Sequence, residues 1–335
     1  MAVFRFSRRG PAGSRERGDD PQQAHQATRT TEIGWKGEPD RLKACLLDMC
    51  ARRIATISIA VMWAAVLVYA SSSPASADSE SRIAFVREPG IWVVMDGIEH
   101  RLTRGSDYRP DWSPDGKWLL FQRFDGDGSD LYRIRADGNR MHALTDDGGY
   151  YHPSWSPDGK RIAFGQHGDL YVMDADGSNR RRLTGSPGEE SRPAWSPDGT
   201  EIAFVSGRGQ NLWIVDAYGS SLRPLTRNAA RDQDPAWSPN GRWIMFARHR
   251  PAQDHDLFLI RADGSGAARQ LTTNGGSDWS PAWSPDGTRI AFTRARYTRS
   301  PAQSLLVVMD LASRERERLA ISSRSELEPD WASIQ

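Results

Sequence analysis

The chain has 335 residues, with 44 lysines and arginines against 43 aspartates and glutamates, so its net charge is close to zero. Residues 54–335 are mildly acidic, with 33 basic and 36 acidic side chains, which argues against a phosphate-binding surface and a nucleic-acid partner. Both cysteines, Cys45 and Cys50, lie near the N-terminus. The rest of the chain therefore needs no disulfide.

The first segment, residues 1–53, is predicted to be a disordered basic extension. It is rich in Arg, Gln, Asp, Gly and Thr and has no apolar periodicity, so it offers too little apolar surface to offset the entropy of ordering. Met49 is an alternative start, because a chain beginning there would carry a signal peptide of ordinary length. Residues 1–48 are then an over-long start assignment.

Residues 54–77 have the pattern of a secretory signal peptide. Arg52-Arg53 precede an uncharged apolar run over 54–70, and Ala75-Ser76-Ala77 follows as a small-residue cleavage site. We expect export by the Sec route, cleavage after Ala77 and a periplasmic or secreted protein. The alternative is an uncleaved anchor that holds the rest of the chain outside the cytoplasm. Any membrane contact is expected only through residues 54–70.

From residue 78 onward the sequence repeats. The stretch Pro193–Gly199, Pro-Ala-Trp-Ser-Pro-Asp-Gly, recurs with small changes four more times, and a shortened copy closes the chain. The tryptophans of successive copies lie 43, 40, 42, 46 and 48 residues apart; they are Trp112, Trp155, Trp195, Trp237, Trp283 and Trp331. Self-similarity at about 40 to 50 residues is typical of a propeller or solenoid.

Each repeat is predicted to form four strands. Ser-Pro-Asp-Gly is a turn signature, because Pro presets φ, Asp bonds nearby backbone and Gly accepts positive φ. The apolar triplets that follow, such as Ile202-Ala203-Phe204, indicate a strand covered on both faces. The proline before each tryptophan cannot lie inside a paired strand, so it belongs to an edge strand. In a propeller that edge strand is the innermost one and faces the central channel.

The two ends of the repeat region complement each other. The first repeat lacks its own Trp-Ser-Pro strand, and the last fragment, Glu328–Gln335, consists of such a strand alone. We therefore predict an all-β, six-bladed β-propeller over residues 78–335, with four-stranded blades and a C-terminal strand that joins the first blade. This closure would remove the exposed edges of the ring.

The repeat resembles the PD40, WD40-like repeat of TolB-type propellers. Pro-x-Trp-Ser-Pro-Asp-Gly-x-x-Ile-Ala-Phe, followed by residues 169–184, carries the resemblance. TolB is a periplasmic component of the Tol-Pal envelope system, with an α/β domain before a propeller that binds a lipoprotein. The short stretch between Ala77 and the first strand leaves no room for that α/β domain. The resemblance implies a non-catalytic platform that binds an envelope protein or peptide.

The residue before each edge-strand proline is predicted to mark the channel mouth on the face where the loops vary between blades. These residues are Arg109, His152, Arg192, Asp234, Ser280 and Glu328. As a binding site, the two arginines would hold a carboxylate, and the two acids would hold an amine or cation. The alternative is a solvated rim whose charges pair with one another. Tyr108, Tyr151 and Trp279 would add aromatic surface beside this mouth.

Other functions have weaker support in the sequence. Residues 125–130 resemble the start of a calcium loop, but Ala136 stands where the bidentate Glu belongs. His152, His167 and His255 have no spacing that enforces a metal site, and no Gly-x-Ser-x-Gly elbow is present. We therefore expect no catalytic residue, no metal, no cofactor and a monomer. The alternatives are a propeller lyase or hydrolase acting on a polysaccharide or small ligand, and a structural module tethered to the membrane.

Overall fold

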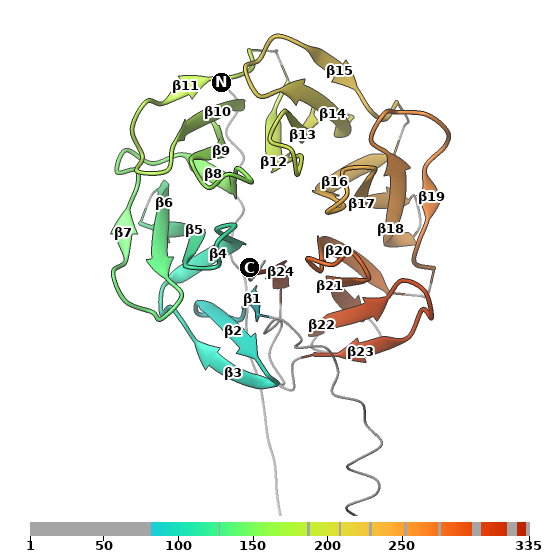
Figure 1. Ribbon diagram of the computed structural model, residues 1–335, viewed down its shortest axis with the longest axis horizontal. Helices are drawn as coiled ribbons and strands as arrows, with labels where there is room; N and C mark the ends of the chain where they lie inside the picture. Colours follow the sequence, from blue (N-terminus) through green and yellow to red (C-terminus); the bar gives the residue numbers. More distant parts are fainter. Residues whose placement is uncertain are drawn as a thin grey trace, which may run out of the picture. The chain divides into compact units, whose positions relative to one another are not determined.

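The computed structural model describes residues 82–126, 128–185, 188–207, 209–227, 230–250, 253–273, 276–296, 303–319 and 327–332. These residues form six four-stranded antiparallel sheets arranged around a central axis, which confirms the predicted six-bladed propeller (Figure 1). The predicted extension and signal segment lie outside the described residues. No helix in the described part of the chain has the length and apolarity needed to cross a membrane.

The two inner strands of each blade follow the repeat. The innermost strands are β4 (Ser106–Trp112), β8 (Tyr150–Trp155), β12 (Glu190–Trp195), β16 (Arg231–Trp237), β20 (Ser277–Trp283) and β24 (Leu327–Trp331). The second strands are β1 (Arg82–Val86), β5 (Trp118–Asp125), β9 (Arg161–Gln166), β13 (Glu201–Ser206), β17 (Trp243–Arg250) and β21 (Arg289–Arg296). The second strands carry consecutive buried residues, as expected for strands packed on both faces.

The third and outermost strands complete each blade, and the outermost strand is the most exposed. The third strands are β2 (Ile91–Met95), β6 (Gly128–Arg135), β10 (Asp169–Asp174), β14 (Asn211–Asp216), β18 (Gln253–Arg261) and β22 (Gln303–Asp310). The outermost strands are β3 (Ile98–Arg101), β7 (His142–Ala143), β11 (Arg181–Arg182), β15 (Leu222–Pro224), β19 (Arg269–Gln270) and β23 (Arg316–Arg318). The outermost strands are short, so each blade presents only a short unpaired strand edge to other chains.

The C-terminal strand closes the ring. β24 pairs antiparallel with β1, with Ile83 opposite Trp331 and Ala84 opposite Asp330, so the first blade has the order β24-β1-β2-β3. This confirms the closure predicted from the incomplete first repeat. Strands from the two ends of the repeat region thus share one sheet (Figure 1).

The Ser-Pro-Asp-Gly turn is held by its serine and its aspartate together. Ser113 Oγ donates to Asp115 Oδ1 at 2.7 Å and accepts the N–H of Trp118 at 2.9 Å. Asp115 Oδ1 also accepts the N–H of Lys117, and Gly116 has a φ of 63°. The same serine contacts recur in the next four copies, at Ser156, Ser196, Ser238 and Ser284. These contacts fix the exit of each innermost strand and therefore the direction in which it crosses the channel wall.

The Leu-Thr pair at the end of the outermost strands has a structural role. Its threonine hydroxyl accepts a buried backbone N–H of the third strand, at 2.9 to 3.0 Å; the threonines are Thr103, Thr145, Thr184, Thr226 and Thr272. A buried N–H without a partner costs about 1–3 kcal/mol. The Leu-Thr repeat is therefore explained by the structure of the blades and does not indicate a ligand-binding site.

Tryptophans pack between neighbouring blades. Trp237 on β16 donates its indole N–H to the carbonyl of Ala194 on β12 at 3.1 Å, and Trp283 on β20 does the same to Ala236 on β16 at 3.2 Å. Trp195 and Trp331 are each 7% exposed. The ring is thus held together by contacts between blades as well as by strand pairing, which gives the channel a defined wall.

The central channel as a candidate binding site

Six β-bulges lie at one level of the channel wall. In each innermost strand the ladder shifts where two residues face one on the second strand, and the first of these two residues has a left-handed φ between 48° and 56°. The residues are Arg109, His152, Arg192, Asp234, Ser280 and Glu328, which we call the channel ring. All six candidate residues predicted from the repeat therefore occupy equivalent positions. A bulge re-aims a side chain, and here six bulges bring the ring residues to the lining of the channel.

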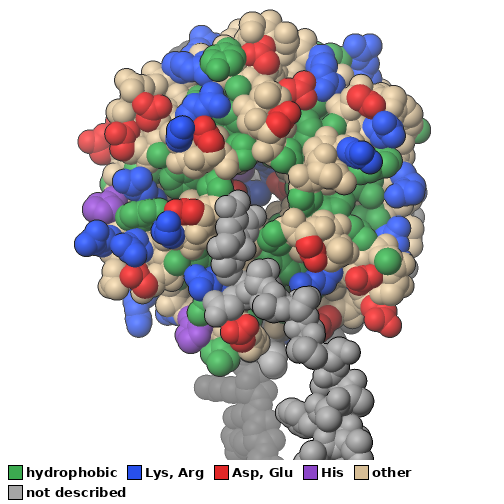
Figure 2. Space-filling model, in the orientation of Figure 1, with side chains coloured by type: hydrophobic (Ala, Val, Ile, Leu, Met, Phe, Trp, Pro, Cys, Tyr) green, Lys and Arg blue, Asp and Glu red, His purple; other side chains and the backbone are tan. Residues whose placement is uncertain are grey.

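The channel ring lines a cavity of about 590 Å³. The cavity runs along the innermost strands to the prolines of the Ser-Pro-Asp-Gly turns, which include Pro114, Pro157 and Pro197. An opening is visible at the centre of the face in Figure 2, with charged side chains deep inside it. The candidate site therefore extends inward from the predicted channel mouth toward the face that carries the constant turns.

Arg109 spans the channel. It comes from β4, and its Nη1 lies 3.1 Å from Asp234 Oδ1 on β16, three blades away in the six-bladed ring. Its other end is held by Glu328 on the neighbouring blade, which accepts Arg109 Nε at 2.9 Å and the Arg109 backbone N–H at 2.7 Å. Glu328 therefore positions the guanidinium that reaches across to Asp234.

Asp234 joins four of the six blades at the channel ring. Its Oδ1 also lies 3.3 Å from Arg192 Nη1, and its Oδ2 accepts the backbone N–H and the hydroxyl of Ser280 at 3.2 Å. Burial alone would raise the pKa of Asp234, but Arg192 and Arg109 hold it well below its usual range. The ring charges thus pair with one another, as in the alternative interpretation of the sequence, and any ligand of these groups must exchange with those pairs.

His152 is the titratable member of the channel ring that stays uncharged at neutral pH. Burial, together with the nearby Arg109 and Arg192, lowers the pKa of His152 well below its ordinary value of 6.5. Its backbone N–H donates to Gln122 Oε1 at 3.3 Å, while its Nδ1 is buried and has no hydrogen-bond partner among the described residues. His152 therefore offers the cavity a neutral imidazole at neutral pH.

The three predicted aromatic residues lie outside the cavity lining. Tyr108 packs edge-on against Phe124 and donates its hydroxyl to Glu88 at 2.8 Å. The Tyr151 hydroxyl accepts the Gly168 N–H at 2.9 Å. Trp279 packs against His255. The structure thus separates these residues from the channel ring, because neighbouring residues of a strand point to opposite sides.

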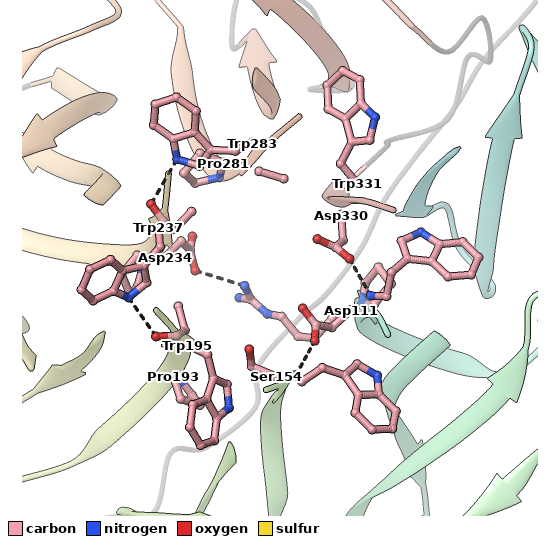
Figure 3. Close-up of a pocket in the computed structure, with 18 of the residues that line it drawn as sticks. Asp111, Ser154, Pro193, Trp195, Asp234, Trp237, Pro281, Trp283, Asp330 and Trp331 are labelled. Atoms are coloured by element: carbon pink, nitrogen blue, oxygen red, sulfur yellow. Dashed lines mark hydrogen bonds and ion pairs between the residues drawn. The ribbon is translucent and has the colours of Figure 1, made fainter. Parts of the chain in front are cut away.

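Two carboxylates that line the cavity were not predicted from the sequence. Asp111 on β4 and Asp330 on β24 come from adjacent blades and both line the cavity, on the same side of the channel (Figure 3). Each occupies the position directly after an edge-strand proline. A comparison of that position across the repeats contains the signal, since only these two copies carry a charge there.

The remaining candidates show local contacts. Asp130, at the end of the calcium-like stretch, accepts the Thr145 hydroxyl at 2.8 Å and the Gly148 N–H at 3.1 Å. His255 contacts Ser277 and His249 rather than His152. Within the described ranges, no group of three or more His, Cys, Asp or Glu side chains is arranged to hold a metal ion.

The fold and the channel define a six-bladed propeller with a narrow, polar central channel. The family model for the TolB beta propeller domain matches residues 80–211 and 208–333. The chain belongs to this family. A curated relative, an uncharacterized protein of Agrobacterium fabrum, is 36% identical over 55 residues, which span 16% of this chain and 19% of that protein.

Solved structures share the fold at low sequence identity. TolB from Acinetobacter baumannii is 23% identical with a TM-score of 0.66, over 76% of this chain and 67% of that chain. A TolB candidate from Agrobacterium tumefaciens is 23% identical with a TM-score of 0.59, over 76% of this chain and 92% of that chain. An oligogalacturonate lyase in complex with manganese is 15% identical with a TM-score of 0.50, over 72% and 74% of the two chains.

Proposed function

We propose that this protein is an exported, non-catalytic binding platform of the cell envelope, which holds a protein or peptide at the channel ring. The observation that carries the proposal is the set of six left-handed bulges. Glycine and asparagine adopt this backbone conformation at the lowest cost, yet neither occurs at any of the six positions. Backbone preference therefore does not explain why Arg109, Arg192 and Glu328 stand there.

The ring combines one backbone geometry with different side chains. Such strain, about 1–3 kcal/mol per residue, persists where surrounding structure enforces it and clusters at functional sites. A partner carboxylate could replace Asp234 between Arg109 and Arg192, and a partner cation could bind the released Asp234. The partner would approach from the face with variable loops, where Tyr108, Tyr151 and Trp279 offer partly exposed aromatic surface.

Export is the second part of the proposal. It rests on the pattern of residues 54–77 and on membership of the TolB propeller family. N-terminal sequencing of the protein recovered from fractionated cells tests it. A mature chain beginning at Asp78 in the periplasmic or secreted fraction is expected; a cytoplasmic chain that keeps residues 54–77 would overturn export.

The binding test compares variants of the full-length protein. Wild-type protein is used to capture partners from native envelope extract, and the captured partner is then purified and titrated. The triple variant Arg109→Ala, Arg192→Ala, Asp234→Ala should bind it at least tenfold more weakly. A control variant, Lys117→Ala with Lys160→Ala, removes two exposed charges next to the Ser-Pro-Asp-Gly turns and should bind normally. Equal affinity of the triple variant, with its fold verified by thermal unfolding, would place binding elsewhere.

A further inference from the structure

The position directly after each edge-strand proline differs between blades. It is aspartate in two adjacent blades, at Asp111 and Asp330, and a small uncharged residue in the other four: Ser154, Ala194, Ala236 and Ala282. All six positions line the cavity. Four blades form without a carboxylate at this position, so the fold itself does not require one. The four blades with an uncharged residue at this position show that the innermost strand forms without an aspartate there.

The two carboxylates are not neutralised by the protein. Asp330 Oδ2 accepts the N–H of Trp112 at 2.6 Å, and Asp111 Oδ2 accepts the N–H of Trp155 at 2.5 Å (Figure 3). Neither forms an ion pair with a basic side chain among the described residues. Burial and the charge of Asp330 raise the pKa of Asp111, and burial raises the pKa of Asp330 to about 7. Two neighbouring buried acids without a cation destabilise the fold.

The charges that line the cavity do not balance. Arg109 and Arg192 are the positive groups; Arg109 pairs with Asp234 and Glu328, and Arg192 pairs with Asp234. Asp111 and Asp330 remain as two acidic groups without a basic partner among the described residues, and they share protons at neutral pH because their pKa values are raised. A positively charged group in the cavity would therefore be attracted without displacing any ion pair of the ring.

A third group on the same side of the channel also lacks a partner. His152 lies on β8, the blade after that of Asp111, and lines the same cavity. Its Nδ1 is buried without a hydrogen-bond partner among the described residues, and the lowered pKa of His152 keeps its imidazole uncharged at neutral pH. A neutral imidazole has one acceptor nitrogen. His152 therefore presents a polar side chain to the cavity without adding positive charge beside Asp111.

The walls of the cavity favour an organic cation. Prolines of the innermost strands and of the turns that follow them line it, and they present an apolar surface to an alkyl chain. Calcium takes six to eight oxygen ligands, whereas this wall offers two carboxylates, each already bonded to a backbone N–H, and the hydroxyl of Ser154. We propose that the cavity binds a primary alkylammonium group between Asp111 and Asp330, with its alkyl chain along the prolines.

This site is distinct from the partner site proposed at the channel ring, because its two carboxyl groups lie outside the channel ring and it leaves the ion pairs of the channel ring intact. Its test needs no protein partner. The full-length chain is titrated with n-butylammonium chloride at pH 8, with n-butanol as the neutral analogue of equal length. Binding of n-butylammonium at least tenfold tighter than n-butanol is expected. Equal binding of the two probes would overturn the proposal.

A matched variant tests the residues. Asp111→Asn with Asp330→Asn keeps side-chain size and an oxygen that can accept each tryptophan N–H, and should weaken n-butylammonium binding at least tenfold. The control is Asp137→Asn with Asp176→Asn, which removes two exposed carboxylates outside the cavity and should bind normally. Unchanged binding by the first variant contradicts the proposal. Displacement of n-butylammonium by equimolar calcium chloride would instead make this a metal site and also overturn it.

A measurement on the wild type keeps the proposal testable if the variant fails to fold. Binding of n-butylammonium should weaken from pH 8 to pH 5, because the acid pair then takes up protons. The other ionisable groups that line the cavity are Arg109, His152, Arg192, Asp234 and Glu328. The pH effect should therefore persist in His152→Gln, which cannot titrate. Binding that is independent of pH would contradict a carboxylate site.

Two sources of an alkylammonium group are separable in the same assay. A blocked tripeptide with a central lysine carries the group on a polypeptide, and putrescine carries it on a free amine. Tighter binding of the peptide than of n-butylammonium would identify a polypeptide lysine as the source, and tighter binding of putrescine would identify a small amine. Failure of all three ammonium probes to bind would overturn the site.

Discussion

Arg109 and Asp234 lie 125 residues apart in the chain and on opposite sides of the ring, yet their side chains meet in the channel at 3.1 Å. The contact is a single side-chain bridge between blades that share no strand pairing. Arg109 is held at its base by Glu328, so the bridge connects the closing blade, its neighbour and the opposite blade. The same residues therefore supply the charged groups of the channel ring and connect the blades of the propeller across the channel.

The first prediction concerns this bridge. Asp234→Asn should lower the free energy of unfolding by about 2–4 kcal/mol, because it leaves Arg109 and Arg192 partly buried with one counter-charge fewer. Urea unfolding followed by tryptophan fluorescence measures this change. In a double-mutant cycle with Arg109→Met, the combined variant should lose less stability than the sum of the single variants. Simple additivity would mean that the bridge contributes nothing to stability.

The second prediction concerns a buried ion pair within one blade. Arg248 makes two contacts with Asp232, at 2.6 and 2.9 Å, and the Asp232 side chain is fully buried. Asp232→Asn should cost about 3–5 kcal/mol, because it leaves a mostly buried guanidinium without its counter-ion. The more exposed pair of Arg223 and Glu201 is the control, and Glu201→Gln should cost less than about 1 kcal/mol. Similar losses in both variants would contradict this account.

The sequence predicted the frame of the molecule and only part of its channel. The recurring turn and tryptophan predicted the strands, the closure of the propeller and the equivalent positions of Arg109 and the other channel-ring residues. These features could be predicted because they depend on local sequence that repeats in each blade. The bulges were not predicted, because they arise where two residues of one strand face one residue of the next. The reach of Arg109 to Asp234 was not predicted either, since equivalent positions in a repeat do not state which side chains cross the channel.

Asp111 and Asp330 were missed for another reason. The predicted ring came from the residue before each proline, which varies between blades, and the residue after the proline was not compared. Two aspartates among four small residues is a signal that one sequence does contain. The consequence, two neighbouring acids without a cation, depends on which blades are adjacent. That adjacency follows from the predicted closure, whereas the lack of a basic partner for the two acids became visible in the described part of the structure.

The third prediction follows from these two acids and concerns pH. Their pKa values are raised in the folded state, to about 7 for Asp330, whereas an unfolded aspartate titrates near 3.9. Their protonation therefore stabilises the fold below about pH 4, and this contribution is lost as the pH rises through about 7. His152, with its lowered pKa, acts in the opposite sense, because unfolding allows it to take a proton as the pH falls below about 6.5.

The comparison of wild type with Asp111→Asn, Asp330→Asn isolates the acids, because His152 is present in both proteins. Between pH 5 and pH 8 the melting temperature of the wild type should fall relative to that of the variant, by on the order of 5 °C. Differential scanning calorimetry at a series of pH values measures this difference. Parallel curves for the two proteins would show that the acids keep ordinary pKa values.

The last prediction concerns closure. β24 supplies the innermost strand of the first blade, the buried Trp331, and both Glu328 and Asp330. A chain that ends at residue 325 should lose cooperative unfolding, because the edge of β1 is exposed and Arg109 loses its anchor. A chain that ends at Ala332 keeps β24 and is the control. Addition of a synthetic peptide of residues 326–335 should restore a sharp transition to the shorter chain, since the missing strand can pair with β1 from solution. A melting curve unchanged by the deletion would show that the blades are held together without β24.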